Sequence, residues 1–364
     1  MDIGEGLAKI TANGGVFYNP KMAKLRDISV MFLRAEGARG KSLLDCTAAT
    51  GIRGIRYALE AGVKQPVLLD INQDAYKAAS ANVKKNRIKG EVLNVGIQEF
   101  ANTTDKKFDI IDLDPFGSPV PYIYDLMKVG SGDTLFMVTA TDTAVLCGAH
   151  PAACVKLYGA KPLHSELCQE GGTRILLGFI LKNAMQFNSG IEPLLSIADM
   201  HYIRVFLRLK KGAEAAADSS KELGFGAFCV SCGRFDCERG IAPRVSNKCG
   251  TCGATMELFG PLWLGRLSDK GILAKMLSDK KEFSEESRRL VSKIHEELDT
   301  PFFYSVPKVT KRLGIGSVSP ALVAGELKAR KHAVSFTHFG QDSIKTDATL
   351  ADVLKAVRKV SKTK

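Results

Sequence analysis

Residues 43–57 read LLDCTAATGIRGIRY, an apolar run followed by a turn of small residues. The apolar run predicts a short buried strand. The small side chains at positions 47–51 allow the backbone to turn closely, and a helix is expected to begin near Ile52. The segment therefore predicts a strand, a tight loop and a helix, which is the unit from which α/β sheets are built.

The same order repeats through the first 140 residues. Strands are predicted for the runs KSLLDC, PVLLD, EVLNV, FDIIDLD and TLFMVTAT, and helices for residues 52–60, 73–86 and 119–128. Strands that alternate with helices predict an α/β fold with a parallel, doubly wound sheet. Residues 194–212 predict one further strand, and residues 213–224, AEAAADSSKELG, predict a loop. After Gly260 the pattern becomes helical and charged, which predicts a second domain.

Composition limits the class of protein. The chain has 364 residues, of which 45% are apolar, so it can bury a sizeable core. It has no uninterrupted apolar run of membrane-spanning length, and its first residues, MDIGEGLAKITANGG, lack the basic start and apolar segment of a leader. We therefore expect a cytoplasmic monomer that does not contact a membrane.

Charge indicates the partner. The net charge is +12, and residues 262–364 carry 20 Lys and Arg against 12 Asp and Glu. Clustered basic side chains gain affinity for nucleic acids by releasing counterions from the phosphate backbone. The basic balance therefore favours a polyanionic partner.

Ligand-binding residues are expected where the strands end, because ligands bind at the carboxyl edge of such sheets. Asp45, Thr47 and Gly51 belong to the first loop, and Arg53 belongs to the first turn of the following helix. We take these four as candidate cofactor-binding residues; an ordinary tight turn is the alternative. The loop lacks the three spaced glycines of a dinucleotide-binding fingerprint.

Asp70 ends the second strand, nineteen residues after Gly51. An acidic residue at this position can accept both hydroxyls of a ribose. The alternative is that Asp70 caps the helix near Gln73. A ribose-binding acid beside a loop without a pyrophosphate fingerprint indicates S-adenosylmethionine.

The stretch DLDPFGSP, residues 112–119, ends another strand. The Asp114 carboxylate and the Pro115 carbonyl can each accept one N–H of an exocyclic amino group. Phe116 can stack on a base, and Gly117 lets the backbone approach closely. The set predicts methylation of an amino nitrogen; alternatively Asp114 caps the next helix and Phe116 lies in the core. Asp112 is expected on the opposite face of the strand and is the weaker candidate.

Four cysteines form two pairs, Cys229-x-x-Cys232 and Cys249-x-x-Cys252, with sixteen residues between the pairs. This spacing predicts a four-thiolate zinc ribbon over residues 226–256, with a structural ion because no coordination position is open. Disulfides or free core thiols are the alternatives. Cys237 could replace one ligand but breaks the spacing.

The C-terminal region predicts a helix-turn-helix followed by a strand. PKVTKRLGI and SPALVAGELKARK read as the two helices, with Ser319 as the N-cap of the second, and AVSFTHF reads as the strand. The basic side chains that could hold phosphates are Lys328, Arg330, Lys331 and Lys345. A solvated charged face is the alternative.

Seven ordered motifs resemble those of the archaeal and eukaryotic tRNA (guanine-26) N2-dimethyltransferases. They are VFYNPKMAKLRDISV, DCTAATGIRGIRY, DLDPFGSPVPYI, TATDTAVLCGAHP, GGTRILLGFI, GPLWLG and SFTHFGQDSIKTDA. The resemblance implies a Rossmann-like class I methyltransferase sheet in residues 1–265, including the zinc ribbon, and a smaller, mainly helical tRNA-binding domain in residues 266–364. It also implies the transfer of one and then two methyl groups to the N2 amino group of a guanine in tRNA.

The resemblance implies roles for further residues. Arg26 resembles the arginine that meets the carboxylate of the methionine moiety, although a solvated helix charge would look the same. Phe17 and Phe116 resemble the aromatic pair that sandwiches the target base, and Phe17 could otherwise be a core residue. Asp114 resembles the catalytic carboxylate. Gln98 stands near the position where many relatives place an acidic residue against the adenine amino group.

Two other functions are compatible with these patterns. One is an amino-methyltransferase that acts on rRNA or DNA. The other is a zinc-containing nucleic-acid-binding protein whose sheet does not catalyse a reaction. The complete DPFG motif together with Asp70 argues against the second.

Overall fold

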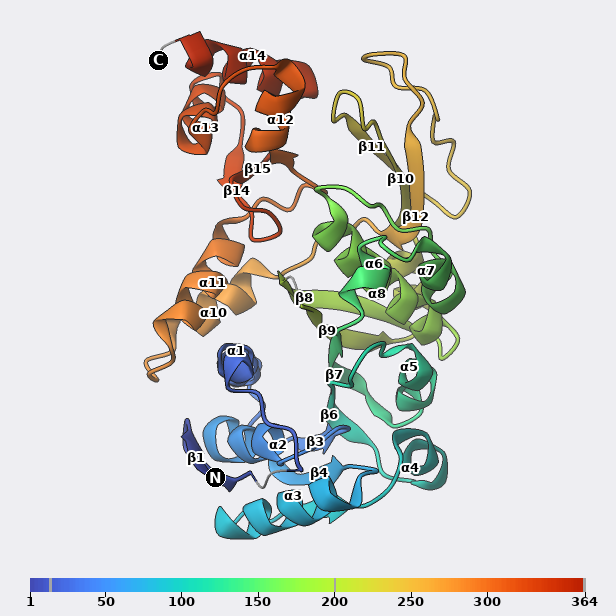
Figure 1. The fold of residues 1–364 in the computed structure, drawn as a ribbon. Coiled ribbons are helices and arrows are strands. Elements are labelled where there is room, and N and C mark those ends of the chain that lie inside the picture. The colour runs from blue at the N-terminus through green and yellow to red at the C-terminus, as the bar shows by residue number, and fades with distance from the viewer. Residues whose placement is uncertain (13–14, 200, 363–364) are drawn as a thin grey trace.

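A computed structural model describes residues 1–12, 15–199 and 201–362. Its centre is a seven-stranded sheet with the order β5-β4-β3-β6-β7-β9-β8 (Figure 1). The strands are β3 (Ser42–Asp45), β4 (Lys64–Leu69), β5 (Glu91–Leu93), β6 (Phe108–Leu113), β7 (Gly130–Ala140), β8 (Ser189–Asp199) and β9 (Tyr202–Lys211). The first five strands pair in parallel, which confirms the doubly wound arrangement predicted from the alternating pattern.

The last two strands correct the sequence prediction. Residues 194–212 contribute to two strands, β8 and β9, which pair antiparallel with each other. Strand β9 also pairs antiparallel with β7, so the sheet is mixed. The apolar pattern continues on both sides of His201, which is why one long strand was predicted.

A second correction concerns residues 213–224. The segment predicted as a loop forms the helix α9 (Ala213–Ser220) and the start of β10. Four of the eight helical residues are alanine, which has the highest helix propensity, and this outweighs the polar appearance of the segment.

Helices cover both faces of the sheet (Figure 1). On one face, α4 (Ile97–Thr103), α5 (Val120–Met127) and α8 (Cys168–Met185) contribute to one apolar core. On the other face, α1 (Ala23–Ala35), α10 (Lys270–Ser278) and α11 (Glu285–Glu296) share a second core with the sheet. The two helices that follow residue 265 therefore pack on the seven-stranded sheet.

The remaining elements of the first part form two groups, one beside β3 and β4 and one, α6 (Thr143–Leu146) with α7 (Pro151–Tyr158), in contact with α8 (Figure 1). The hairpin of β1 (Asp2–Glu5) and β2 (Ala8–Thr11) packs with α2 (Ile52–Arg56) and α3 (Gln73–Lys85) in a smaller apolar cluster. The other elements are η1 (Pro20–Met22) and the π-helical turn η2 (Tyr57–Ala61).

A three-stranded antiparallel sheet carries the paired cysteines. It consists of β10 (Leu223–Phe228), β11 (Phe235–Arg239) and β12 (Glu257–Trp263), with β10 in the middle. Arg312 donates from Nε to the carbonyl of Val230 at 3.3 Å and pairs with Glu166 at 2.7 Å. One side chain of the C-terminal part thus bridges the cysteine-bearing sheet and the segment before α8.

The C-terminal part has an apolar core of its own, which begins at Tyr304. The predicted helix-turn-helix is present as α12 (Val306–Leu313) and α13 (Pro320–Ala329), with Ser319 at the N-cap position. Its other elements are β13 (Tyr304–Ser305), β14 (Val334–Phe336), β15 (Ser343–Thr346) and α14 (Leu350–Lys362). Within the described residues, none of the helices is both long and apolar enough to cross a lipid bilayer.

Candidate active site

The loop after β3 is held closely against the second strand. The Ala48 N–H donates to the carbonyl of Leu69 at 2.9 Å, and Gly51 has a φ of 78°. A Cβ at Gly51 would lie 3.3 Å from Leu68 Cδ2, so this position combines a left-handed backbone with a close approach. The loop predicted from the small residues is therefore a tight turn beside the end of β4.

Asp45 connects the end of β3 to the helix that follows this loop. Its buried carboxylate accepts the N–H of Gly54 at 3.1 Å. Burial, together with the charge of nearby Asp112, raises the pKa of Asp45 to about 7. Asp45 is therefore partly protonated near neutral pH. Thr47, in the same loop, accepts the Asp114 N–H on Oγ1 at 3.2 Å and so connects the loop to the end of β6.

Asp70 is joined to the same loop. Its Oδ2 accepts the N–H of Ala49 at 2.8 Å, and its Oδ1 accepts the N–H of Asn72 at 2.9 Å. The helix-cap alternative for Asp70 is wrong, because the Asn72 side chain caps α3 by accepting the N–H groups of Asp74 and Ala75.

The residues next to Asp70 include one that sequence analysis missed. Ile71 is 79% exposed, and a Cβ added at Gly96 would lie 3.6 Å from its Cδ1. Gln98 is exposed in the first turn of α4 and donates to the Pro121 carbonyl at 3.3 Å. The sequence signal for Ile71 was its position directly after Asp70, the acid that ends the strand. An exposed apolar side chain at that position can pack against the face of a planar ligand ring.

Asp114 follows β6 and is bonded to an arginine. Its Oδ2 accepts a hydrogen bond from Nη2 of Arg53, and Arg53 Nη1 lies 4.0 Å from Asp112 Oδ2. The helix-cap alternative is wrong, because α5 begins only at Val120 and Pro119 occupies its N-cap position. Burial alone would raise the pKa of Asp114, but the charges of Arg53 and Arg204 outweigh it and hold that pKa below its ordinary value.

Asp112 lies on the same side as Asp114, which corrects the expectation that it faces the opposite side of the strand. Both carboxylates approach the Arg53 guanidinium, as alternate residues of a strand must. Asp112 is buried and accepts hydrogen bonds from Tyr57 Oη at 2.7 Å and Arg204 Nη2 at 2.8 Å. Its oxygens are therefore engaged inside the protein, and sequence analysis missed Tyr57 and Arg204 because they are distant in the chain.

Two exposed aromatic rings stand beside this carboxylate turn. Phe17 is 54% exposed and Phe116 is 77% exposed, and their ring centroids lie 4.8 Å apart at 85°. Neither ring belongs to the core, so the core alternatives for both residues are wrong. Gly117, with φ of 79°, donates its N–H to Thr141 Oγ1 at 2.7 Å and thereby fixes the turn that includes buried Pro115.

Arg26 is buried, so the solvated-charge alternative is wrong. Its Nε donates to Glu5 Oε1 at 2.7 Å, and its Nη2 donates to the Asn19 carbonyl at 3.1 Å. Burial would raise the pKa of Glu5, but hydrogen bonds and charge from Arg26, with further bonds from Tyr18 and Arg56, lower it to about 2. The guanidinium of Arg26 is thus already paired with a carboxylate of this chain.

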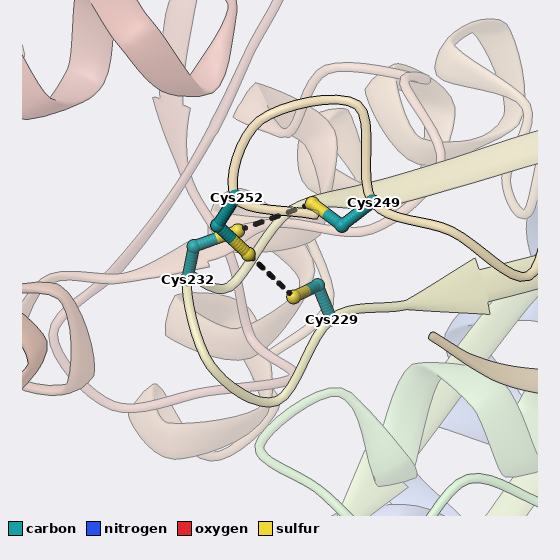
Figure 2. A group of neighbouring side chains, drawn as sticks. All are labelled: Cys229, Cys232, Cys249 and Cys252. Atoms are coloured by element: carbon teal, nitrogen blue, oxygen red, sulfur yellow. Dashed lines mark hydrogen bonds between the residues drawn. The ribbon is translucent and has the colours of Figure 1, made fainter. Parts of the chain in front are cut away.

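The four paired cysteines lie together. Cys229 and Cys252 have their sulfurs 3.5 Å apart, as do Cys232 and Cys249. Figure 2 shows the four side chains pointing toward one another from two loops. All four sulfurs lie within 4.8 Å of one another. Ligands about 2.3 Å from a tetrahedral ion are about 3.8 Å apart, so the cluster has the dimensions of a four-sulfur metal site. Cys237 lies on β11 and is not part of the cluster.

The basic candidates of the C-terminal part separate into two kinds. Lys328 and Lys331 are exposed, and Arg330 pairs with Glu326 at 2.8 Å. Lys345 is only 2% exposed and pairs with Glu170 of α8 at 3.2 Å, so the expectation that it grips phosphate is wrong. Lys345 is buried because its side chain extends from β15 toward Glu170 of α8.

A groove of about 780 Å³ lies elsewhere, between α11 and the segment that joins β14 to β15. Arg288, Lys293 and Phe336 are among its lining residues. None of the candidate catalytic or cofactor-binding residues lines it, so it is not the site formed at the ends of the strands.

Comparisons with known proteins agree with this geometry. Residues 3–358 match the family model of N2,N2-dimethylguanosine tRNA methyltransferase. The tRNA (guanine(26)-N(2))-dimethyltransferase of Pyrococcus horikoshii is 35% identical, over 99% of this chain and 98% of the relative. The enzyme of the same description from Pyrococcus abyssi is 36% identical, over 96% of each chain.

A solved structure is similar over the full length. The complex of Trm1 from Pyrococcus horikoshii with S-adenosyl-L-methionine has a TM-score of 0.91 and 34% identity, covering 98% of this chain and 99% of that one. The central sheet, the sheet of β10 to β12 and the C-terminal helices thus all fall within the alignment to one solved structure. The chain belongs to the N2,N2-dimethylguanosine tRNA methyltransferase family.

Proposed function

We propose that this protein transfers methyl groups from S-adenosylmethionine to the N2 amino group of guanine 26 in tRNA, giving N2-methylguanine and then N2,N2-dimethylguanine. Family membership supports the reaction and the substrate. The observation that carries it is the position of Asp114, an ionised carboxylate just after a strand end that lies two residues from Phe116 of the exposed aromatic pair and is bonded through its N–H to the loop held by Asp70.

The residues around the first two strand ends fit the proposed cofactor, which would supply an electrophilic methyl group. Asp70 would accept the ribose hydroxyls, and Asp45, Thr47 and Gly51 would shape the loop against which the cofactor lies. Ile71 and Gln98 would meet the adenine ring. Arg26 would meet the carboxylate of the methionine moiety, and for this its guanidinium must share or exchange its bond to Glu5.

The target base would lie between Phe17 and Phe116. In the structure the two rings touch edge to face, so insertion of a base requires at least one of them to rotate. Their exposure permits this. The Asp114 carboxylate and the Pro115 carbonyl would then each accept one N–H of the guanine amino group, and the two bonds would aim its nitrogen at the methyl donor.

Asp114 also acts electrostatically. The amino nitrogen gains positive charge as the methyl arrives, so a fixed carboxylate stabilises the transition state more than the ground state. The methylated nitrogen then loses a proton, and Asp114 or a water beside it accepts that proton. A carboxylate whose pKa is held low by Arg53 and Arg204 is ionised throughout the neutral range and is ready for this role.

We propose that the four cysteines hold one Zn²⁺ ion. The sulfur separations support a tetrahedral site, and four protein thiolates leave no position for substrate, which makes the metal structural. The ion would fix the two loops that connect β10 with its neighbours.

The remaining proposals concern organisation. Residues 1–265 form the methyltransferase domain with its ribbon at residues 226–256, and residues 266–364 grip the tRNA through exposed basic side chains such as Lys328 and Lys331. The shared core of α1, α10 and α11 implies that this boundary in the chain does not separate two independent bodies. We propose a monomer that works in the cytoplasm, where its substrate is.

Methyl transfer from labelled S-adenosylmethionine tests the function. We expect incorporation into a tRNA transcript with guanine at position 26, loss of incorporation when adenine replaces it, and both products in nucleoside mass spectrometry. Ribosomal RNA and duplex DNA serve as competing substrates. Preferential labelling of either one would replace this proposal with the alternative amino-methyltransferase, and no labelling of any substrate would favour a binding protein.

A further inference from the structure

Arg53 lies between two carboxylates at the end of β6, Asp112 and Asp114, rather than along the loop that the sequence assigned to the cofactor. Its side chain is almost fully buried, with Nη2 bonded to Asp114 and Nη1 near Asp112. Nη1 has no hydrogen-bond partner among the described residues. Buried guanidinium groups ordinarily have hydrogen-bond partners, so the burial of this one is offset mainly by its two carboxylate neighbours.

The charged side chains around Arg53 comprise three carboxylates and one other cation. Asp45 on β3, Asp112 on β6 and Asp114 just after it contribute three carboxylates. Arg204 of β9 contributes the other cation, and both of its bonds to carboxylate oxygens, at 2.8 and 2.9 Å, go to Asp112. Arg53 is therefore the cation in direct contact with Asp114.

The polar neighbours do not replace that contact. Thr139 of β7 accepts a hydrogen bond from Arg204 Nη1 at 2.7 Å, and Tyr57 donates its hydroxyl to Asp112. Without Arg53, three carboxylates would share one arginine that is already engaged. A partly buried carboxylate close to other carboxylates takes up a proton more readily, because burial and like charge both raise its pKa.

We propose that Arg53 is a positioning residue for the methyl-transfer step: it holds the Asp114 carboxylate ionised and in a fixed orientation toward the guanine amino group, and it is not a ligand of the cofactor. The inference rests on the proposed function, since it assumes that Asp114 faces the target base. It accounts for an arginine in the first turn of α2 that pairs with carboxylates at the end of β6, whereas Arg56, one turn later, pairs with Glu5, Asp27 and Glu60.

The test is the pH profile of the single-turnover rate, measured at saturating tRNA and S-adenosylmethionine for the wild type and for Arg53→Met, Arg53→Lys and Asp114→Asn. Cofactor affinity is measured by calorimetry at each pH, which separates any titration of Asp45 in the cofactor loop. Arg208→Met is the matched control, because Arg208 lies on β9 away from the strand ends and pairs with Glu36 and Glu192.

The expected result is a shift of the acid limb of the pH–rate profile, which is the pH range in which the single-turnover rate falls as Asp114 becomes protonated. Arg53→Met should move it about 1 to 3 pH units upward and lower the plateau rate, since an opposite charge lowers a carboxylate pKa by about that amount. Arg53→Lys should keep the limb near the wild-type pH because the charge remains, with a lower plateau because a single ammonium orients the carboxylate less well. Arg208→Met should leave both features and cofactor affinity unchanged.

Three outcomes overturn the inference or its premise. An unmoved acid limb in Arg53→Met, with weakened cofactor binding, would make Arg53 a cofactor ligand. If the methionine variant does not fold, Arg53→Lys decides: weakened cofactor binding with a wild-type plateau would overturn the proposal in the same way. A wild-type rate in Asp114→Asn would instead overturn the catalytic assignment of Asp114, whatever Arg53 does.

Discussion

Asp70 and Ala49, separated by twenty residues of helix and strand, are joined by a hydrogen bond of 2.8 Å from the Ala49 N–H to Oδ2. The acid at the end of β4 therefore fixes the turn after β3 as well as presenting its carboxylate at the edge of the sheet. The affinity of any ligand that binds Asp70 therefore also depends on the conformation of that turn.

Replacing Asp70 tests this dual role. Asp70→Ala should weaken S-adenosylmethionine binding by about 1.5–3 kcal/mol, roughly 10- to 150-fold, because charge-assisted hydrogen bonds to the ribose are lost. Asp70→Asn retains one acceptor and should lose less. Calorimetry on folded variants measures both, and an alanine variant that binds the cofactor as tightly as wild type would remove Asp70 from the site.

Replacing Asp114 tests the chemistry. Asp114→Ala should reduce the single-turnover rate at least about 10²- to 10³-fold, and Asp114→Asn should retain more activity because it keeps one acceptor oxygen. Both variants should bind cofactor and tRNA nearly normally. Methylation by the alanine variant at a near wild-type rate would reduce the DPFG turn to a structural feature.

The cysteine cluster predicts one zinc per chain. Cys249→Ser should lower the metal content and the thermal stability before it affects methyl transfer, because the ligands fix two loops and not the catalytic edge. Cys237→Ser is the matched control and should keep the metal. Elemental analysis together with thermal denaturation measures both effects; metal-free wild-type protein of unchanged stability and activity would contradict the site.

The C-terminal basic residues predict a salt dependence. Replacing Lys328 and Lys331 with alanine should flatten the fall of tRNA affinity with salt, by about one unit of slope for each phosphate that is no longer neutralised, without affecting cofactor binding. Lys345→Met provides the contrast: because Lys345 is buried against Glu170, it should lower thermal stability and leave the salt slope unchanged. An unaltered slope in the double variant would place the tRNA surface elsewhere.

Asp45 predicts a pH dependence of stability. Its pKa is raised to about 7 in the folded protein, whereas an unfolded aspartate titrates near about 3.9. The stability that this proton contributes is complete below the unfolded value and is lost as the pH rises through about 7. Asp45→Asn should therefore lose less stability than wild type over that interval, as measured by urea unfolding at a series of pH values.

A variant of Asp109 serves as the comparison, because this residue should make the protein less stable as the pH falls, the opposite of Asp45. Burial would raise the pKa of Asp109, but hydrogen bonds from the Ser42 backbone and hydroxyl lower it, so its contribution to stability disappears as the pH falls. Asp109→Asn should reduce the pH dependence of the free energy of unfolding only at acidic pH. Identical pH profiles for wild type and Asp45→Asn would contradict the protonation described for Asp45.

The sequence predicted the parts of the fold that depend on local pattern. The five parallel strands β3 to β7, the turn at Gly51, the helix-turn-helix around Ser319 and the clustering of the cysteines all follow from periodicity and spacing within short segments. The hairpin of β8 and β9 did not, because an almost continuous apolar run gives no sign of where the chain reverses.

The site was predictable in its strand-end carboxylates and less so in their partners. Asp70 and Asp114 end predicted strands, but Arg204 comes from a strand some ninety residues after Asp114 and reaches the cluster only through tertiary pairing. The same limit applies to Lys345, whose sequence neighbours resemble those of a surface lysine. Ile71 was visible in the sequence, although its meaning depended on its exposure.

The bridge made by Arg312, between the Val230 carbonyl and Glu166, has a consequence for how a guanine would be chosen. Because Arg312 ties the C-terminal helices to both the cysteine-bearing sheet and the segment before α8, we expect the span from Lys328 to Asp114 to vary little. A tRNA docked on those helices would offer Asp114 only the nucleotide that lies at that span. Selection would then depend on the length and angle of the stems, and a base pair inserted between docking point and target would displace the correct guanine from the site.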